Sequence, residues 1–201
     1  MANFCEQVET AQPVSVDNHA ALKLSLESTG RMPNPNQRRE TVSFGQVDSV
    51  ILRDDWEKGI TEASPAPFSE YHSTKFPETK LCFFYRGHRM SESGSNSFTQ
   101  TLSQADHALS QSEIKSLDEV LGTKADKESY TMLDARTQSL NGKRVLIVRG
   151  AYLENHYENE TVYVDSDGSG SAVQEIYWQS PRSDYAAQGQ VRAALRSISW
   201  K

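Results

Sequence analysis

The chain is poor in cysteine, in long apolar runs and in basic charge. Its two cysteines, Cys5 and Cys82, can pair or remain free thiols, and 201 residues bury enough core to need no disulfide framework. The longest apolar runs, Leu81–Tyr85 and Val145–Val148, are far shorter than the roughly 20 residues that span a bilayer. We therefore expect no membrane-spanning helix.

Lysine and arginine together number 21 against 27 aspartates and glutamates, which gives a formal net charge of −6. An acidic surface repels nucleic-acid phosphates unless a local basic patch overrides it. The apolar set makes up only 36% of the chain, while charged residues at 24% and aromatics at 9% are ordinary for folded proteins. The composition predicts a folded protein with a lean core and no nucleic-acid partner.

The first residues bear on localisation. Met1–Glu6 has neither the basic region nor the apolar region of a secretory signal. We therefore expect a cytoplasmic protein. A periplasmic or secreted location is the alternative, because a signal that had been removed would leave the same sequence.

Short apolar segments and polar breaks alternate in the first half of the chain. Alternating leucines and β-branched or aromatic residues predict four strands, at 22–26, 41–44, 47–52 and 81–86. Residues 53–80 contain three prolines and are expected to be mostly irregular. Three polar stretches, two here and one further along the chain, are predicted to be exposed loops: 30–39, 91–97 and 154–160.

Helical spacing begins after the second polar stretch. Apolar residues recur every three or four positions over 98–109. Ser110 and Glu113 then form a capping box, and the apolar stripe that follows stops at Gly122. We predict a helical hairpin over 98–122.

The last third of the chain predicts an antiparallel meander closed by a helix. Residues with high β-propensity predict strands at 137–140, 143–153, 161–164 and 172–178. Asn141-Gly142 is a strong hairpin signal between the first two of them. After these strands, Ser183 can cap an amphipathic helix whose apolar stripe runs from Ala187 to Ile198.

The order of the elements gives an α+β fold, with an antiparallel sheet meander, two or three helices packed on one face and a C-terminal amphipathic helix. We treat residues 1–201 as a single domain, and the alternative is a loosely separate N-terminal part at 1–80. The strands, the Ser-Pro segment and the helix that leads to Trp200 resemble the end of PsbP-like domains over 137–201. The resemblance implies the same α+β architecture, and it carries over no functional residue.

A Gly- and Asp-rich turn in the meander is a candidate metal site. On a calcium-loop count, Asp165, Asp167 and Ser169 occupy the first, third and fifth positions, and Gly170 occupies the sixth. The twelfth position, which needs a bidentate carboxylate, falls on Ile176. We favour a plain hairpin turn, and calcium, the one cofactor that the sequence suggests, is the alternative.

A compact basic cluster, Arg86, His88 and Arg89, stands where the predicted strand at 81–86 ends. Guanidinium groups bind phosphate and carboxylate oxygens in a bidentate manner, so the cluster is a candidate site for a small anionic ligand. No glycine-rich phosphate-binding motif accompanies it. A charged turn without a ligand is therefore the alternative.

Tyr163 and Tyr177 fall on neighbouring predicted strands, on the face opposite Val162, Val164 and Ile176. An aromatic face of this kind can be the floor on which the terminal helix packs, or it can be an exposed binding surface. We favour the floor, because the apolar stripe of the helix must be buried against something.

No catalytic motif accompanies these features. The sequence contains no GxSxG, HExxH or CxxC pattern, and Cys82 lies in an apolar run where burial makes a thiol inert. We therefore expect a non-catalytic accessory or binding protein that holds a small anionic ligand or a protein partner on its sheet or strand-end loops. The alternative is a small enzyme whose anionic substrate is bound by Arg86, His88 and Arg89.

Overall fold

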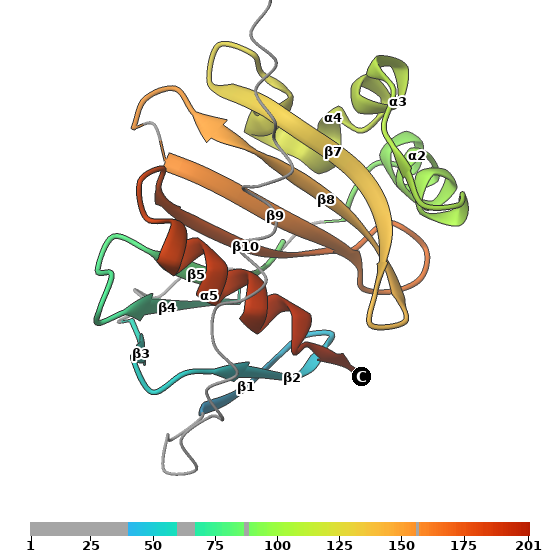
Figure 1. Ribbon diagram of the computed structural model, residues 1–201. Helices are drawn as coiled ribbons and strands as arrows, with labels where there is room; N and C mark the ends of the chain where they lie inside the picture. The colour runs from blue at the N-terminus through green and yellow to red at the C-terminus, as the bar shows by residue number, and fades with distance from the viewer. Residues whose placement is uncertain (1–39, 60–66, 87–88, 156) are drawn as a thin grey trace, which may run out of the picture. The chain divides into compact units, whose positions relative to one another are not determined.

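The computed structural model describes residues 40–59, 67–86, 89–155 and 157–201, which belong to one compact unit, Gln37–Lys201. Two antiparallel sheets, with helices on both faces of the larger one, build an α+β fold (Figure 1). The α+β class, the antiparallel meander and the C-terminal helix predicted from the sequence are confirmed. The strand predicted at 22–26 and the loop predicted at 30–39 lie outside the described residues, and the single-domain assignment of 1–201 stays a prediction.

The smaller sheet has three strands in the described part of the chain, in the order β1-β2-β11. They are β1 (Glu40–Phe44), β2 (Val47–Leu52) and β11 (Ser199–Trp200). The strands predicted at 41–44 and 47–52 are thus confirmed. Ser199 pairs with Ser49, so the last strand of the chain completes the sheet that the first hairpin begins.

The larger sheet has eight strands among the described residues, in the order β3-β4-β5-β10-β9-β8-β7-β6. They are β3 (Trp56–Lys58), β4 (Phe68–Ser73), β5 (Lys80–Tyr85), β6 (His107–Ala108), β7 (Tyr130–Leu140), β8 (Lys143–Tyr152), β9 (Tyr157–Asp165) and β10 (Val173–Pro181). The predicted turn joins β7 to β8, with φ angles of 49° at Asn141 and 86° at Gly142. Positive φ at both positions is what a two-residue type I′ hairpin turn requires.

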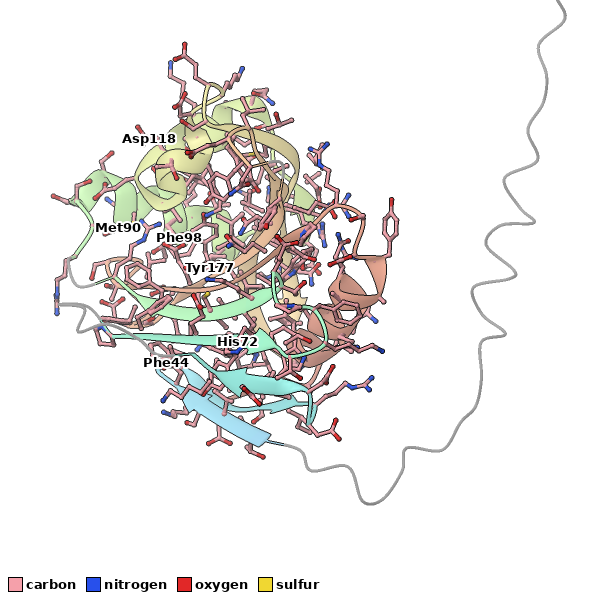
Figure 2. The ribbon with its side chains drawn as sticks, turned by 90° about the vertical axis from the view of Figure 1, so that its left-hand side faces the viewer. Phe44, His72, Met90, Phe98, Asp118 and Tyr177 are labelled. Atoms are coloured by element: carbon pink, nitrogen blue, oxygen red, sulfur yellow. The ribbon has the colours of Figure 1, made fainter. Side chains whose placement is uncertain are left out.

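Helices lie on both faces of the larger sheet. One face carries α2 (Glu92–Ser103), α3 (Gln111–Ser116), α4 (Asp118–Leu121) and a 3₁₀ turn, η1 (Gly122–Ala125). The terminal helix α5 (Tyr185–Arg196) lies on the opposite face, which the smaller sheet also covers (Figure 2). The prediction of two or three helices on one face is met by α2, α3 and α4. None of the helices in the described residues is long and apolar enough to cross a membrane.

Each face of the larger sheet buries its own core, because successive residues of a strand point to opposite faces. On one face, Leu146 and Tyr163 are buried with Phe98 of α2. On the other face, Val162 is buried with Leu195 of α5. The sheet is therefore the shared wall of two cores.

The terminal helix does not pack on the face of Tyr163 and Tyr177, so that prediction is wrong. Tyr163 is fully buried under the helices of the other face. Along β10, the face that α5 covers carries Ile176 and Trp178, whereas the opposite face carries Glu175 beside Tyr177. The apolar stripe of α5 is buried against the more apolar of the two faces.

The segment 91–97, predicted to be an exposed loop, is the start of α2. Ser91 is its N-cap, and the Ser91 hydroxyl accepts a hydrogen bond from the Gly94 amide at 3.1 Å. Gly94 and Ser95 are buried, and a side chain at Gly94 would collide with Glu119. Capping and close packing of small residues stabilise this turn in place of large apolar side chains.

The helix predicted over 98–109 is shorter than expected and ends at Ser103. His107 and Ala108 instead form β6 on the edge of β7, where His107 pairs with Thr137. The rest of the predicted helical hairpin is confirmed in part. The capping box at Ser110 is present, and Gly122 caps α4, but the chain between them divides into two short helices, α3 and α4.

Residues 53–80 and 154–160 are more regular than predicted. Strands β3 and β4 lie within the first segment, and Pro77 lies in the turn between β4 and β5, where it breaks no ladder. In the second segment β9 begins at Tyr157, and the polar residue Glu160 is only 9% exposed. A buried glutamate in a central strand is unusual, and Glu160 lines a pocket between the larger sheet and α5.

Candidate anion-binding site

Arg86, the first residue of the predicted basic cluster, makes its contacts inside the protein. Its Nε donates to Glu175 Oε1 at 2.7 Å, and both side chains are only 10% exposed. Its Nη1 donates to the Glu119 carbonyl at 2.7 Å, and its Nη2 donates to the Val120 carbonyl. Arg86 therefore holds the C-terminal end of α4 against β10.

The other two residues of that cluster add little to a site. Arg89 is exposed, and His88 lies outside the described residues. Anion binding by Arg86, His88 and Arg89 stays a prediction, and for Arg86 it would require an exchange of its internal partners for a ligand.

The turn that contains Asp165, Asp167 and Ser169 uses its carboxylates on its own backbone. Asp165 accepts hydrogen bonds from the Gly168 and Gly170 amides, both at 3.0 Å. Asp167 accepts from the Ser169 amide at 3.0 Å and from the Ser171 hydroxyl. In the described ranges, His, Cys, Asp and Glu side chains form no group of three or more that could hold a metal ion. Calcium binding at this turn stays a prediction.

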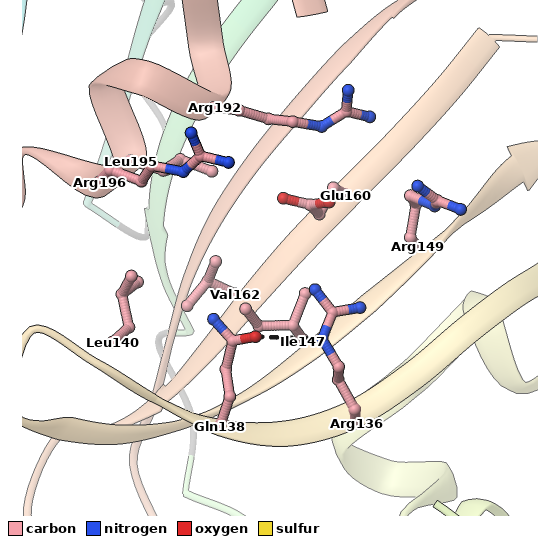
Figure 3. A pocket seen from close by; sticks show the side chains of 10 residues that line it. All are labelled: Arg136, Gln138, Leu140, Ile147, Arg149, Glu160, Val162, Arg192, Leu195 and Arg196. Carbon is pink, nitrogen blue, oxygen red and sulfur yellow. Dashed lines mark hydrogen bonds between the residues drawn. The ribbon is translucent and has the colours of Figure 1, made fainter. Parts of the chain in front are cut away.

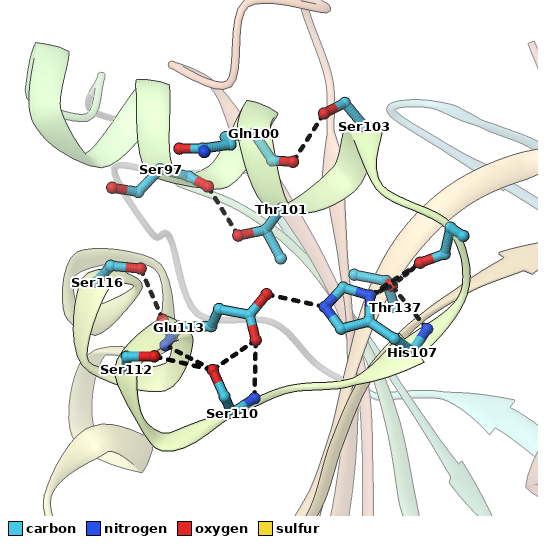
Figure 4. Close-up of polar contacts among 11 residues, drawn as sticks. Ser97, Gln100, Thr101, Ser103, His107, Ser110, Ser112, Glu113, Ser116 and Thr137 are labelled. Carbon is cyan, nitrogen blue, oxygen red and sulfur yellow. Dashed lines mark hydrogen bonds and ion pairs between the residues drawn. The ribbon is translucent and has the colours of Figure 1, made fainter.

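A second polar cluster ties β6 to α3 (Figure 4). His107 Nε2 lies 2.9 Å from Glu113 Oε1, and His107 Nδ1 lies 2.8 Å from the Ala105 carbonyl. The bond to Ala105 and the bond to Glu113 raise the pKa of His107. Hydrogen bonds from Ser110 and from His107 lower the pKa of Glu113 to about 2. The hydrogen bond between His107 and Glu113, which is an ion pair when His107 is protonated, joins β6 to the capping box of α3, and the hydrogen-bonding groups of the cluster pair with one another.

A pocket of about 270 Å³ between α5 and strands β7, β8 and β9 gathers several charged side chains (Figure 3). We call it the arginine pocket. Four arginines and one glutamate line it together with a glutamine and four aliphatic residues. The lining residues are Arg136, Gln138, Leu140, Ile147, Arg149, Glu160, Val162, Arg192, Leu195 and Arg196.

Strand alternation and helix spacing bring these side chains together. Arg149 on β8 and Glu160 on β9 are directly paired across the strands and point to the face that α5 covers. Arg136 on β7 joins them from the same face. Arg192 and Arg196 are four residues apart, so both project from one side of α5.

Three of the four arginines have no acidic partner in the described part of the chain. Arg136 pairs with Asp134, which lies outside the pocket lining, but Arg149, Arg192 and Arg196 make no ion pair there. The Arg149 Nε is buried and has no hydrogen-bond partner. A buried donor of this kind costs about 1–3 kcal/mol unless something satisfies it.

Arg192 is held in place by an aromatic ring. Its guanidinium carbon lies 5.1 Å from the centre of the Trp178 ring, and Trp178 is fully buried. A cation over an aromatic face is stabilised without any use of its hydrogen-bond donors. The Arg192 guanidinium is thus oriented and still available to a ligand.

The lining carries four positive charges against the single negative charge of Glu160. This net positive site lies in a chain whose formal charge is −6. Guanidinium groups bind phosphate and carboxylate oxygens with two parallel hydrogen bonds. The arrangement is therefore suited to hold a small anion.

The arginine pocket is absent from the sequence predictions, although two signals for it are present. Arg149 interrupts the apolar run of β8, and Arg192 and Arg196 share one side of the predicted terminal helix. A charged residue inside a central strand is worth attention because strands of this kind rarely bury charge without a reason. The packing of α5 on this face was needed to show that the two signals meet.

Comparisons with known proteins bear on the fold. The chain matches no family model and no curated protein. It is similar to the solution structure of cyanobacterial PsbP (CyanoP) from Synechocystis sp. PCC 6803, with a TM-score of 0.51 at 8% identity, over 88% of this chain and 99% of that one. LpqN, involved in cell envelope biogenesis of Mycobacterium tuberculosis, is matched with a TM-score of 0.44 at 14% identity, over 82% of this chain and 91% of LpqN. The similarity to PsbP confirms the predicted architecture-level resemblance and shows the fold alone.

Proposed function

We propose that this protein is a non-catalytic accessory protein that binds a small anionic ligand in the arginine pocket. The observation that carries the proposal is the convergence of four guanidinium groups, three of them without an acidic partner among the described residues. The ligand supplies the missing negative charge. The ligand we propose is the small anion predicted from the sequence, but its site is the arginine pocket, on the face of the larger sheet opposite Arg86.

The lining favours binding over catalysis. It contains no serine, threonine, cysteine, histidine or lysine, so it offers no nucleophile, and Glu160 is its single acid or base. The small-enzyme alternative at Arg86, His88 and Arg89 stays a prediction, as does a protein partner. Localisation in the cytoplasm, with a periplasmic or secreted location as the alternative, also stays a prediction.

Isothermal titration of the full chain with inorganic phosphate, pyrophosphate and citrate tests the proposal. We expect at least one of these anions to bind, with an affinity that falls as the salt concentration rises, because the contacts are ionic. Arg149→Gln and Arg192→Gln should each weaken binding about tenfold or more, since a charge-assisted hydrogen bond contributes about 1.5–3 kcal/mol.

Arg182→Gln is the matched control, because Arg182 is exposed and lies outside the pocket. It should leave the affinity unchanged. Equal binding by the Arg149→Gln and wild-type chains, or no binding of these three anions or of any phosphorylated polyol, would show that the pocket is not an anion site.

A further inference from the structure

The arginine pocket contains one feature that a simple anion does not explain. Glu160 is only 9% exposed, and its carboxylate has no ion pair or hydrogen bond with any described residue. Figure 3 shows this carboxylate in the middle of the pocket, with guanidinium groups around it. Although the residue is largely buried, its carboxylate oxygens reach the open space of the pocket, where a ligand that displaces water must supply their hydrogen-bond donors.

A second polar group of the pocket also has hydrogen-bond donors that are not in use. Arg136 Nε donates to Gln138 Oε1 at 3.0 Å, which fixes the orientation of the amide. The Gln138 amide nitrogen is left with two donors and no partner in the described part of the chain. The pocket therefore presents a neutral donor and a carboxylate acceptor beside its guanidinium groups.

The remaining wall is apolar. Leu140, Ile147, Val162 and Leu195 contribute aliphatic side chains to the lining. The pocket volume of about 270 Å³ is just below the roughly 300–1,000 Å³ that is usual for small-molecule sites. This is room for one small ring with a single charged substituent.

Resting on the proposed function, we infer that the arginine pocket selects a phosphorylated polyol, such as a sugar phosphate, over inorganic phosphate. The phosphate group is bound by the guanidinium groups of Arg149 and Arg192. Hydroxyl groups of the ligand donate to Glu160 and accept from Gln138, and the C–H face of the ring packs on the aliphatic wall around Val162. Inorganic phosphate would bring its oxygens against the Glu160 carboxylate and leave the wall uncovered.

The reason for selectivity is the hydrogen-bond acceptor that Glu160 presents to the pocket. A site built to hydrogen-bond a ligand hydroxyl discriminates strongly against an analogue that lacks it, because the analogue displaces water from the group in the site without replacing its hydrogen bonds. In this pocket that group is Glu160. Its charge repels a bare anion, and its lone pairs need the hydroxyl donors that a polyol provides.

Titration of the full chain with glucose 6-phosphate, fructose 6-phosphate, glycerol 3-phosphate and myo-inositol 1-phosphate, beside inorganic phosphate and glucose, tests the inference. We expect one of the phosphorylated polyols to bind at least about tenfold more tightly than inorganic phosphate, which is about 1.4 kcal/mol. Glucose without phosphate should not bind measurably. If inorganic phosphate binds as tightly as every polyol phosphate, the inference is wrong.

Glu160→Gln is the decisive variant, because it keeps the shape of the side chain and removes the charge. Inorganic phosphate should bind more tightly to Glu160→Gln than to the wild type, and the preference for the polyol phosphate should fall several-fold. An equal gain for both ligands would overturn the inference and would indicate general charge repulsion only. Glu128→Gln, at an exposed turn, is the control and should change neither affinity.

The failure of this inference differs from the failure of the proposed function. If the pocket is not an anion site, Arg149→Gln changes no affinity and none of the phosphates binds there. If the pocket binds anions without selecting polyols, Arg149→Gln weakens inorganic phosphate and polyol phosphate alike, and the wild type does not distinguish them.

Discussion

The contact between Arg86 and Glu175 gives the sharpest prediction for stability. Both side chains are 10% exposed, and one arginine satisfies a carboxylate and two backbone carbonyls of α4. Arg86→Met keeps the aliphatic stem and removes the guanidinium. The variant leaves the Glu175 charge buried without its partner, and it removes the hydrogen bonds that Arg86 donates to the Glu119 and Val120 carbonyls.

Removal of one partner of a buried ion pair typically costs about 3–5 kcal/mol. Domains of this size are stable by about 5–15 kcal/mol, so Arg86→Met should remove a large part of the free energy of unfolding. With a urea m-value of roughly 2 kcal/mol per molar, the midpoint of unfolding should fall by about 1.5–2.5 M. The m-value itself should not change, because the folded state buries the same surface.

Equilibrium urea unfolding, followed by tryptophan fluorescence, measures the effect. Arg89→Met is the matched control, because Arg89 is exposed three residues further on, and its effect should stay within about 0.5 kcal/mol. The double variant Arg86→Met with Glu175→Gln should be more stable than Arg86→Met alone, since it removes the uncompensated charge. The reasoning is refuted if Arg86→Met loses less than about 1 kcal/mol, or if Glu175→Gln destabilises the Arg86→Met protein further.

Four further outcomes are expected. Gly142→Ala should lower the free energy of unfolding by about 1 kcal/mol, because φ is +86° and a side chain there meets no atom within 4 Å, so the cost is backbone strain alone. Gly189→Ala, on an equally open surface of α5, should raise it by about 0.5–1 kcal/mol in the same urea assay. Folding raises the pKa of His107, so the contribution of His107 to the free energy of unfolding is complete below pH 6.5 and is lost as the pH rises through the folded pKa. Folding lowers the pKa of Glu113 from 4.5 to about 2, so the contribution of Glu113 is complete above pH 4.5 and is lost as the pH falls toward 2. The stability difference between the wild type and Glu113→Gln should therefore be largest between about pH 4.5 and 6.5, and a difference that does not vary with pH would contradict this assignment. Arg149→Gln should not destabilise the unliganded protein, because it removes a like charge from the pocket, and a thermal midpoint well below that of the wild type would count against that account.

Parts of the fold with a complete local signal could be predicted from the sequence. The turn at Asn141-Gly142 fixes the register of β7 and β8 by itself, because both residues must adopt positive φ. The capping box of Ser110 and Glu113 marks the start of α3 in the same way. In both cases the information lies within four residues, so no tertiary contact is needed to interpret it.

The missed elements depend on contacts that are distant in sequence. The start of α2 has almost no apolar side chains, and it is stabilised by Ser91 bonding to Glu119, 28 residues away. Strand β6 exists because the edge of β7 pairs with it. Local propensity alone favours a loop at the start of α2 and a longer helix through the residues of β6. Tertiary contacts override the local propensity in both segments.

The candidate site shows the same limit for function. Arg86 has the features of an anion-binding residue in the sequence, at a strand end beside other cations, yet burial turns its donors to Glu175 and to the end of α4. Arg149 has the features of a residue on a strand, and the fold brings it to the same pocket as Arg192, 43 residues away, without an ion pair to any carboxylate in the described ranges. The two arginines differ in whether the fold supplies an acceptor for them, and that is set by topology rather than by neighbours in the chain. The buried Arg149 Nε, which has no acceptor among the described residues, is therefore the group from which we infer a ligand.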